Sequence, residues 1–212
     1  MFRSFVPIVV AAALVVLVAG VASPAFGAPD KTTIKTIDNL QAAFNGESNA
    51  HARYLAFAEK AKQDGYGPVA SLFRAAARAE KVHADNHADA LRKLGVTAVA
   101  KIEAPVVKTT QENLEAAIKG EVYERDVMYP EFITTATAEG QQRALRSFNL
   151  AKTAEAEHAN LYSDSLKNLD TLKIAAGKTY YVCEVCGLTT TNLDFEKCIS
   201  CFSPKERYVA VS

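Results

Sequence analysis

Five glutamates and two histidines stand at positions where the helical period of the sequence predicts an inward-facing side chain. They are Glu47, Glu80, His83, Glu121, Glu124, Glu155 and His158. A buried, unpaired carboxylate is costly, and no Lys or Arg occupies these inward positions to offset the charge. Two divalent or trivalent cations would supply that charge, and carboxylate with imidazole is a ligand set suited to iron or manganese.

The spacing of these side chains is that of a dimetal site inside a helix bundle. Glu80 with His83, and Glu155 with His158, are three positions apart, so each pair lies on one helix face. Di-iron carboxylate bundles take one Glu from each of two helices and a Glu-x-x-His pair from each of the other two. Along this chain, four helical stretches supply Glu, Glu-x-x-His, Glu and Glu-x-x-His in that order. We therefore predict a dimetal centre in the bundle interior.

Four further polar side chains lie close to the same inward stripes. His51 and His87 each stand one helical turn beyond a predicted ligand, which favours a hydrogen-bonded core histidine over a metal ligand. Tyr54 and Tyr129 fit either as ordinary core aromatics or as phenols that donate a hydrogen bond to a ligand carboxylate.

All four cysteines lie near the end of the chain in two C-x2-C pairs, Cys183 with Cys186 and Cys198 with Cys201. Two such pairs can close a tetrahedron of thiolates around one metal ion. A structural zinc ribbon and, in an exported protein, two disulfides are the alternatives. Adjacent C-x2-C pairs in a segment with so little apolar core favour metal over disulfides, but the cysteines alone do not separate iron from zinc.

The elements that would position these groups are four long helical patterns between residues 33 and 169. Pro68 can open the second pattern, and Pro130 should kink the third. The segment 96–108 has no helical stripe and is long for a connection between neighbouring helices, which indicates a crossover. A long middle connection is typical of ferritin-like bundles rather than of simple up-down bundles.

We therefore predict a mainly α protein with two domains. A ferritin-like four-helix bundle should span residues 33–172, and a small four-cysteine metal domain with short β-prone runs should span 178–212. The second domain is too small to fold on apolar burial alone, so a bound metal would hold it together.

The start of the chain has the pattern of an export signal. Met1–Arg3 carries positive charge, Phe5–Ala22 is an apolar run, and small residues at Ala25 and Gly27 place cleavage after Gly27. An uncleaved membrane anchor is the alternative, because the apolar run is just long enough to span a bilayer. We predict a signal peptide at 1–27 and an exported, periplasmic protein.

The charge balance excludes one class of partner. Among 212 residues, Lys and Arg total 24 and Asp and Glu also total 24, and the pI is about 6.9. A chain without a strongly basic half lacks the electrostatic footprint that nucleic acid requires. We therefore expect no nucleic-acid partner.

At the level of motifs, the chain from Thr33 to Val211 resembles the rubrerythrins. The motifs that carry the resemblance are Gly46-Glu47-Ser48, Arg53-Tyr54, Glu80-Lys-Val-His83, Gly120-Glu121-Val-Tyr-Glu124, Met128-Tyr129-Pro130-Glu131-Phe132, Glu155-Ala-Glu-His158 and a rubredoxin-like cysteine pair with Ser203-Pro204-Lys205. The tail departs from the family at Ile199, where Pro is common, and at Leu188, where an aromatic residue is usual.

The resemblance implies a di-iron site with a defined set of ligands. They would be Glu47, Glu80, Glu121, Glu124, Glu155 and His158, with Glu80 and Glu155 bridging the irons. By the same resemblance, His83 would exchange with Glu124 on one iron as the redox state changes, and Tyr54 and Tyr129 would donate hydrogen bonds to the ligands.

The resemblance also implies a function. The protein would reduce hydrogen peroxide to water at two non-haem irons, with electrons returned by a third iron at the rubredoxin-like cysteines from a donor protein that the sequence does not identify. Because the two metal sites of one chain are expected to lie far apart, a head-to-tail homodimer would bring them together. The alternative is a ferroxidase or iron-handling protein with a structural zinc tail, and a dimetal protein without turnover is disfavoured because burying so much charge is costly.

Overall fold

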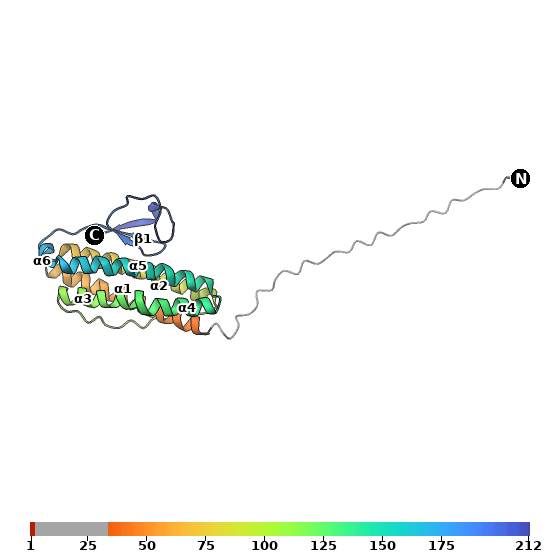
Figure 1. Ribbon diagram of the computed structural model, residues 1–212, viewed down its shortest axis with the longest axis horizontal. Helices are drawn as coiled ribbons and strands as arrows, with labels where there is room; N and C mark the ends of the chain where they lie inside the picture. Colours follow the sequence, from red (N-terminus) through yellow and green to blue (C-terminus); the bar gives the residue numbers. More distant parts are fainter. Residues whose placement is uncertain (3–33) are drawn as a thin grey trace.

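The computed structural model describes residues 1–2 and 34–212 (Figure 1). The predicted signal peptide and its cleavage site fall almost entirely outside these residues. Among the described residues, no helix is both long enough and apolar enough to cross a membrane.

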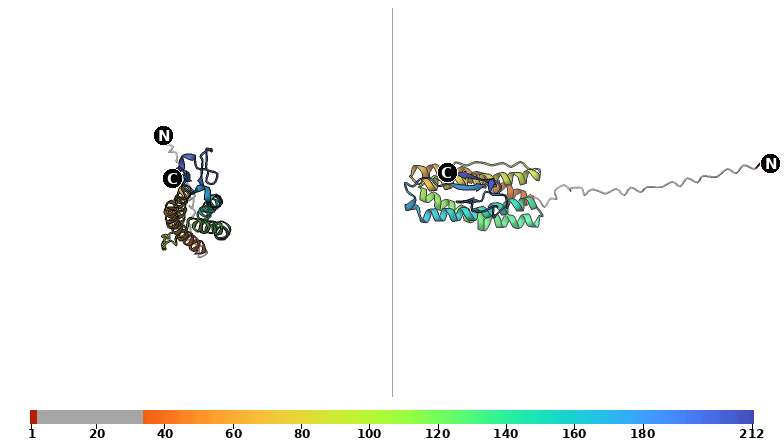
Figure 2. Two further views of the ribbon diagram at one scale, coloured as in Figure 1. Left: turned by 90° about the vertical axis from the view of Figure 1, so that its left-hand side faces the viewer. Right: turned by 90° about the horizontal axis from the view of Figure 1, so that it is seen from above.

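Long helices lie side by side and form the body of the molecule (Figures 1 and 2). The helical elements are α1 (Ile34–Gln63), α2 (Gly67–Lys93), α3 (Thr110–Tyr123), the π-helical segment η2 (Glu124–Met128), α4 (Tyr129–Ala138), α5 (Gln142–Lys167) and the short α6 (Leu169–Leu172). The third helix of the bundle is α3, η2 and α4 in succession. The π-helical segment ends at Met128, two residues before Pro130, which lacks a backbone N–H and lies in the first turn of α4.

The crossover at 96–108 is held along α1 by amide side chains one helical turn apart. Asn45 Oδ1 accepts from the backbone N–H of Lys101 at 2.8 Å, and Asn49 Oδ1 accepts from that of Glu103 at 2.8 Å. Two Asn side chains on one face of α1 therefore supply the hydrogen bonds that the backbone of an extended segment cannot make within itself.

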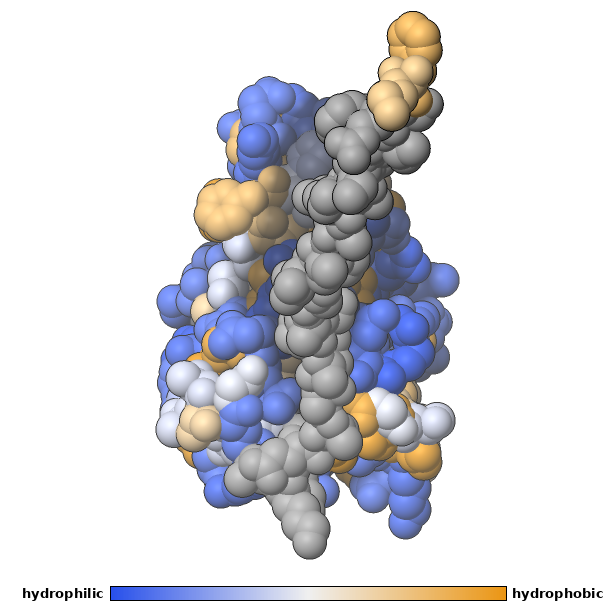
Figure 3. Space-filling view, turned by 90° about the vertical axis from the view of Figure 1, so that its right-hand side faces the viewer, coloured by the Kyte–Doolittle hydropathy of each residue, from blue (hydrophilic) through white to orange (hydrophobic). Residues whose placement is uncertain are grey.

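The bundle core consists of two apolar clusters with a polar layer between them. Along α1, Leu40 and Ala43 belong to one cluster, Ala50 and Tyr54 belong to the other, and the buried Glu47 lies between them. Outside the core, Figure 3 shows one end of the molecule, where hydrophilic residues predominate and hydrophobic residues are scattered among them. The burial pattern thus leaves a carboxylate-lined layer in the middle of the bundle.

The C-terminal domain contains a small antiparallel sheet of strands β1 (Tyr180–Cys183), β2 (Thr189–Thr190) and β3 (Tyr208–Val211) in the order β2-β1-β3. The sheet lies against the side of the bundle (Figure 1), and Tyr180 and Val182 of β1 join the apolar core cluster of the helices. Asn86 on α2 donates to the carbonyl of Val185 at 3.0 Å. The four-cysteine domain is therefore docked on the helices of its own chain.

Candidate metal centre

The polar layer of the bundle collects six of the seven predicted ligands into two overlapping groups. One group contains Glu47, Glu80, His83 and Glu155, and the other contains Glu80, Glu121, Glu155 and His158. Within each group, one possible ligand atom from every residue lies within 4.8 Å of the others, and all six residues are buried. Because Glu80 and Glu155 belong to both groups, the arrangement suits two metal ions bridged by two carboxylates.

The contacts inside the layer are those of ligands that converge on a common point. His158 Nδ1 lies 3.0 Å from Glu155 Oε2 and 3.5 Å from Glu80 Oε1, yet it has hydrogen-bond geometry to neither oxygen. Several carboxylate oxygens here are likewise buried without a hydrogen-bond partner among the described residues: Glu47 Oε2, Glu80 Oε1, Glu121 Oε2 and both oxygens of Glu155. Buried polar atoms are normally satisfied, so these orphaned atoms fit bound cations.

Both histidines are oriented by groups from the C-terminal domain. His158 Nε2 lies 3.0 Å from Thr189 Oγ1, and His83 Nε2 lies 3.1 Å from the carbonyl oxygen of Cys186. A carbonyl can only accept, so Nε2 of His83 carries the proton in this contact and Nδ1 faces the carboxylates. Such partners fix the tautomer and the ring orientation of a metal-binding histidine. The docked domain therefore completes the outer surroundings of the dimetal site.

Two buried phenols hold carboxylates of the layer from opposite ends. Tyr54 donates its O–H to Glu121 Oε1 at 2.5 Å, and Tyr129 donates to Glu47 Oε1. Each tyrosine belongs to a different apolar cluster, so each carboxylate is fixed by a phenol that is itself immobilised by packing.

Glu124 is the one predicted ligand that the structure leaves outside both groups. It is half-buried at the start of the π-helical segment, while His83 lies within the first group. Burial and the carboxylates of Glu121, Glu155 and Glu80 raise the pKa of Glu124 well above its usual value. The predicted exchange of His83 with Glu124 stays a prediction.

The electrostatics show how much positive charge the layer lacks. Burial and the surrounding carboxylates raise the pKa of Glu47 well above its usual value. Burial and the charge of Glu80 raise the pKa of Glu121 to about 7. Burial alone would lower the pKa of His83, but Glu155 and Glu80 raise it to about 10. Without metal, the layer gains positive charge by binding protons.

Glu47→Gln should stabilise the metal-free protein and weaken its metal binding. A carboxyl group with a raised folded-state pKa contributes stability below its usual value of 4.5, and that contribution is lost as the pH rises. The amide keeps the size of Glu47 and can still accept from Tyr129. The free energy of unfolding of the metal-free variant should therefore exceed that of wild type by roughly 1–3 kcal/mol at about pH 8, and by less at about pH 5.

The measurement is denaturant unfolding of both proteins at the two pH values, with and without metal. Metal should reverse the order, because a neutral amide is a poorer ligand than a carboxylate. An equal gain at both pH values would contradict the assignment of the effect to the Glu47 charge.

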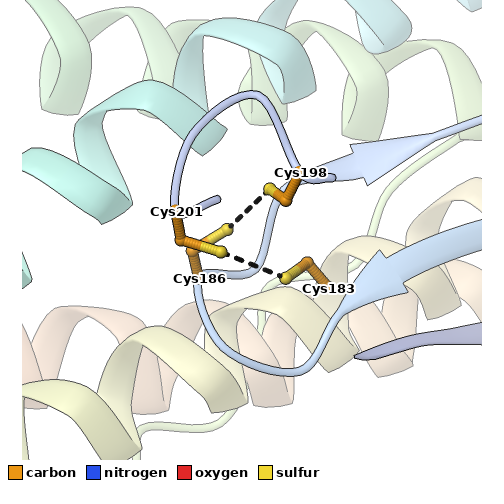
Figure 4. A group of neighbouring side chains, drawn as sticks. All are labelled: Cys183, Cys186, Cys198 and Cys201. Atoms are coloured by element: carbon orange, nitrogen blue, oxygen red, sulfur yellow. Dashed lines mark hydrogen bonds between the residues drawn. The ribbon is translucent and has the colours of Figure 1, made fainter. Parts of the chain in front are cut away.

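The four cysteines form a second cluster, in which the side chains converge from two loops of the C-terminal domain (Figure 4). The Sγ atoms of Cys183 and Cys201 lie 3.6 Å apart, as do those of Cys186 and Cys198. A disulfide requires about 2.05 Å, whereas thiolates about 2.3 Å from one tetrahedral metal lie about 3.8 Å from each other. The geometry therefore fits one metal ion rather than two disulfides.

The two clusters are in direct contact within one chain. Cys186 supplies one sulfur to the four-cysteine cluster, and its carbonyl oxygen touches the imidazole of His83 in the dimetal layer. Gly187 makes this approach possible, because a Cβ on it would overlap the His83 ring. The expectation that the two metal sites lie far apart in one chain is therefore wrong.

Some contributors to the site gave no recognisable signal in the sequence. Thr189 and the Cys186 carbonyl reach the histidines only because the C-terminal domain docks on α2 and α5. Gly187 is part of a common cysteine-loop pattern, so the sequence gives no sign that it also leaves space for the His83 ring.

The fold and the two clusters define the class of protein: a ferritin-like helical bundle with a carboxylate–histidine dimetal site, joined to a four-cysteine metal domain. Comparison with known proteins narrows this class. The rubrerythrin family model matches residues 38–166. The chain belongs to the rubrerythrin family.

Individual relatives agree with this assignment. Nigerythrin of Nitratidesulfovibrio vulgaris is 37% identical over 86% of this chain and 90% of its own. Rubrerythrin-2 of Clostridium acetobutylicum is 36% identical over 82% of this chain and 96% of its own. A solved structure of fully reduced, all-ferrous nigerythrin superposes with a TM-score of 0.76 and 37% identity, covering 82% of this chain and 86% of that chain.

More distant structures share the fold of the helical domain. Desulfovibrio desulfuricans bacterioferritin matches with a TM-score of 0.65 at 21% identity, covering 71% of this chain and 93% of that chain. The predicted ferritin-like architecture is thus confirmed.

Proposed function

We propose that this protein is a non-haem di-iron peroxidase that reduces hydrogen peroxide to water, with electrons relayed through a rubredoxin-like four-cysteine iron centre, and that it protects against oxidative stress. The observation that carries the proposal is the contact between Cys186 and His83, which joins the two ligand clusters within one chain. A tail that served only to hold itself together would not need to touch a ligand of the dimetal site.

The residues present fit this assignment. Glu47, Glu80, His83, Glu121, Glu155 and His158 would hold two irons, and Cys183, Cys186, Cys198 and Cys201 would hold a third. Two ferrous ions in the bundle would supply the two electrons that cleave the O–O bond of hydrogen peroxide. The apolar clusters above and below the layer keep bulk water away, and the two phenols hold the carboxylates in place.

The relatives support iron in this role. Nigerythrin has been solved in a mixed-valence state and in a fully reduced, all-ferrous state, so the metals of that relative change oxidation state. This chain is 37% identical to nigerythrin over 86% of its own length. We infer the same metal for this protein, including the four-cysteine site, where zinc is the competing occupant.

The location and the assembly are proposals of the same kind. The apolar run of the first residues supports export to the periplasm, either as a cleaved protein or as an anchored one. A head-to-tail homodimer stays a prediction from the family resemblance, although proximity of the two clusters does not require it.

Metal analysis with visible spectroscopy and rapid mixing tests the proposal. The purified protein should contain about three irons per chain, with thiolate-to-iron charge-transfer absorption from the cysteine site. The reduced protein should then be oxidised by hydrogen peroxide faster than by oxygen in stopped-flow experiments, and the cysteine iron should be oxidised after the bundle irons.

Two results would reject the proposal. A colourless four-cysteine site that holds zinc would remove the electron relay and favour the iron-handling alternative. Oxidation by peroxide that is no faster than oxidation by oxygen would exclude a peroxidase, even with iron in every site.

A further inference from the structure

A chain of hydrogen bonds leads from the dimetal layer to the surface of the bundle through residues that the proposed chemistry has not used. Tyr129 Oη donates to Glu47 Oε1, His87 Nε2 lies 3.1 Å from Tyr129 Oη, and Ser147 Oγ lies 2.8 Å from His87 Nδ1. Glu47, His87 and Tyr129 are each 0% exposed, so the middle of this hydrogen-bond chain is sealed from solvent.

The directions of these hydrogen bonds follow from the chemistry of the partners. The phenol proton of Tyr129 is committed to the Glu47 carboxylate, so Tyr129 Oη accepts from His87 and Nε2 carries the imidazole proton. Burial lowers the pKa of His87 to about 3, so the ring is neutral and Nδ1 accepts from the Ser147 hydroxyl. Every donor in the chain therefore points toward the dimetal layer.

The outer end of the chain reaches water. Ser147 is 6% exposed and lines a cavity of about 90 Å³ together with Asp89 and Arg143. The side chains of Asp89 and Arg143 are 36% and 59% exposed, so the cavity communicates with solvent. A cavity of this size with polar walls can hold water.

The other phenol of the layer, Tyr54, has no comparable route to the surface among the described residues. Tyr54 donates to Glu121, but its ring packs against Phe57, Phe73 and Tyr162. Tyr162 Oη has no hydrogen-bond partner among the described residues. Among residues 34–212, Tyr54 Oη is hydrogen-bonded to Glu121 and the Arg53 guanidinium lies 5.3 Å from its ring centre, whereas Tyr129 Oη also meets an imidazole. The two tyrosines are therefore not equivalent.

We propose that Ser147, His87 and Tyr129 form a proton relay that delivers protons from the surface cavity to Glu47 beside the dimetal site. In one shift, Tyr129 passes its proton to Glu47 and takes the Nε2 proton of His87, His87 Nδ1 takes the proton of Ser147, and Ser147 is reprotonated from cavity water. The inference rests on the proposed function, because reduction of one hydrogen peroxide to two waters consumes two electrons and two protons. Two shifts, with the relay reset between them, supply those protons.

The test compares single-turnover oxidation of the iron-loaded, reduced full chain by hydrogen peroxide in H2O and in D2O. His87→Gln keeps a polar side chain but cannot exchange protons between two ring nitrogens, so it should slow oxidation roughly 10- to 100-fold and increase the solvent isotope effect. Ser147→Ala should slow oxidation less, roughly 3- to 10-fold, because cavity water can replace the hydroxyl. Ser147→Thr keeps a hydroxyl and should have the wild-type rate.

Matched controls separate the relay from general damage. His51→Gln changes a histidine whose Nδ1 bonds the backbone carbonyl of Ala77, and Ser165→Ala removes a buried hydroxyl from the same helix as Ser147. Both should keep the wild-type rate and isotope effect. A purely structural role of His87 would slow the reaction equally in H2O and D2O.

A second readout does not depend on turnover. In the zinc-loaded, diamagnetic full chain, NMR of 15N-labelled histidine should show neutral His87 with its proton on Nε2. A proton on Nδ1 would overturn the relay, as would a His87→Gln variant with wild-type rate and isotope effect, and the peroxidase proposal would survive both. If wild-type protein reacts with peroxide no faster than with oxygen, the peroxidase proposal fails and the relay fails with it.

Discussion

Replacing Gly187 with alanine should weaken metal binding in the bundle by roughly 10- to 100-fold, although Gly187 binds no metal itself. A Cβ at this position would lie 2.7 Å from Cδ2 of His83 and closer still to Nε2. The imidazole is held on its other side by Glu80 and Glu155, so either the ring leaves the ligand layer or the four-cysteine domain lifts from the bundle. Both outcomes break the contact with the Cys186 carbonyl.

Gly95→Ala is the matched control for this substitution. Gly187 and Gly95 have φ values of 78° and 77°, but a Cβ on Gly95 would meet nothing within 4 Å. The free energy of unfolding of Gly95→Ala should therefore fall by only roughly 1–2 kcal/mol, because an alanine is strained in the left-handed region. Gly187→Ala should lose roughly 1–3 kcal/mol more stability, because its Cβ also overlaps the His83 ring.

The measurements are metal affinity, denaturant unfolding and the visible spectrum of the cysteine iron. Retained thiolate-to-iron absorption would show that the cysteine cluster itself survives the substitution. If Gly187→Ala matched Gly95→Ala in stability and kept wild-type metal affinity, the close approach of the two clusters would be refuted.

The second large effect is expected from Glu155→Gln, which should empty the bundle of both metals and leave the four-cysteine metal in place. Glu155 belongs to both ligand groups, and neither of its oxygens has a hydrogen-bond partner among the described residues. An amide is nearly the same size but carries no charge and offers only one oxygen. Iron should fall from about three to about one per chain, because both ions lose a shared anionic ligand.

Metal analysis of purified Glu155→Gln, with a spectrum of the remaining cysteine iron, checks this prediction. Glu157→Gln makes the same chemical change two positions along α5, outside both ligand groups, and should keep the full metal content. Retention of two bundle irons by Glu155→Gln would exclude the bridging position of this carboxylate.

The helices and the inward ligands were predictable because their signals are local. Glu80 and His83 share a face through the helical period alone, and each helix carries its own apolar stripe. The third helix shows the limit of such reasoning, since Pro130 indicated a kink and the structure has a π-helical segment before it. A periodic pattern identifies a helix, but it does not resolve how the hydrogen-bond ladder adjusts around a proline.

The sequence by itself determined a ferritin-like bundle with a polar layer and a separate four-cysteine domain, because helical periods and C-x2-C spacings are properties of neighbouring residues. Only the tertiary structure decided how these parts meet: Cys186 against His83, Thr189 against His158, and Ser147 behind His87. Those contacts join residues from separate elements, up to 103 positions apart. Their geometry depends on how whole elements pack, and no short spacing in the sequence encodes it.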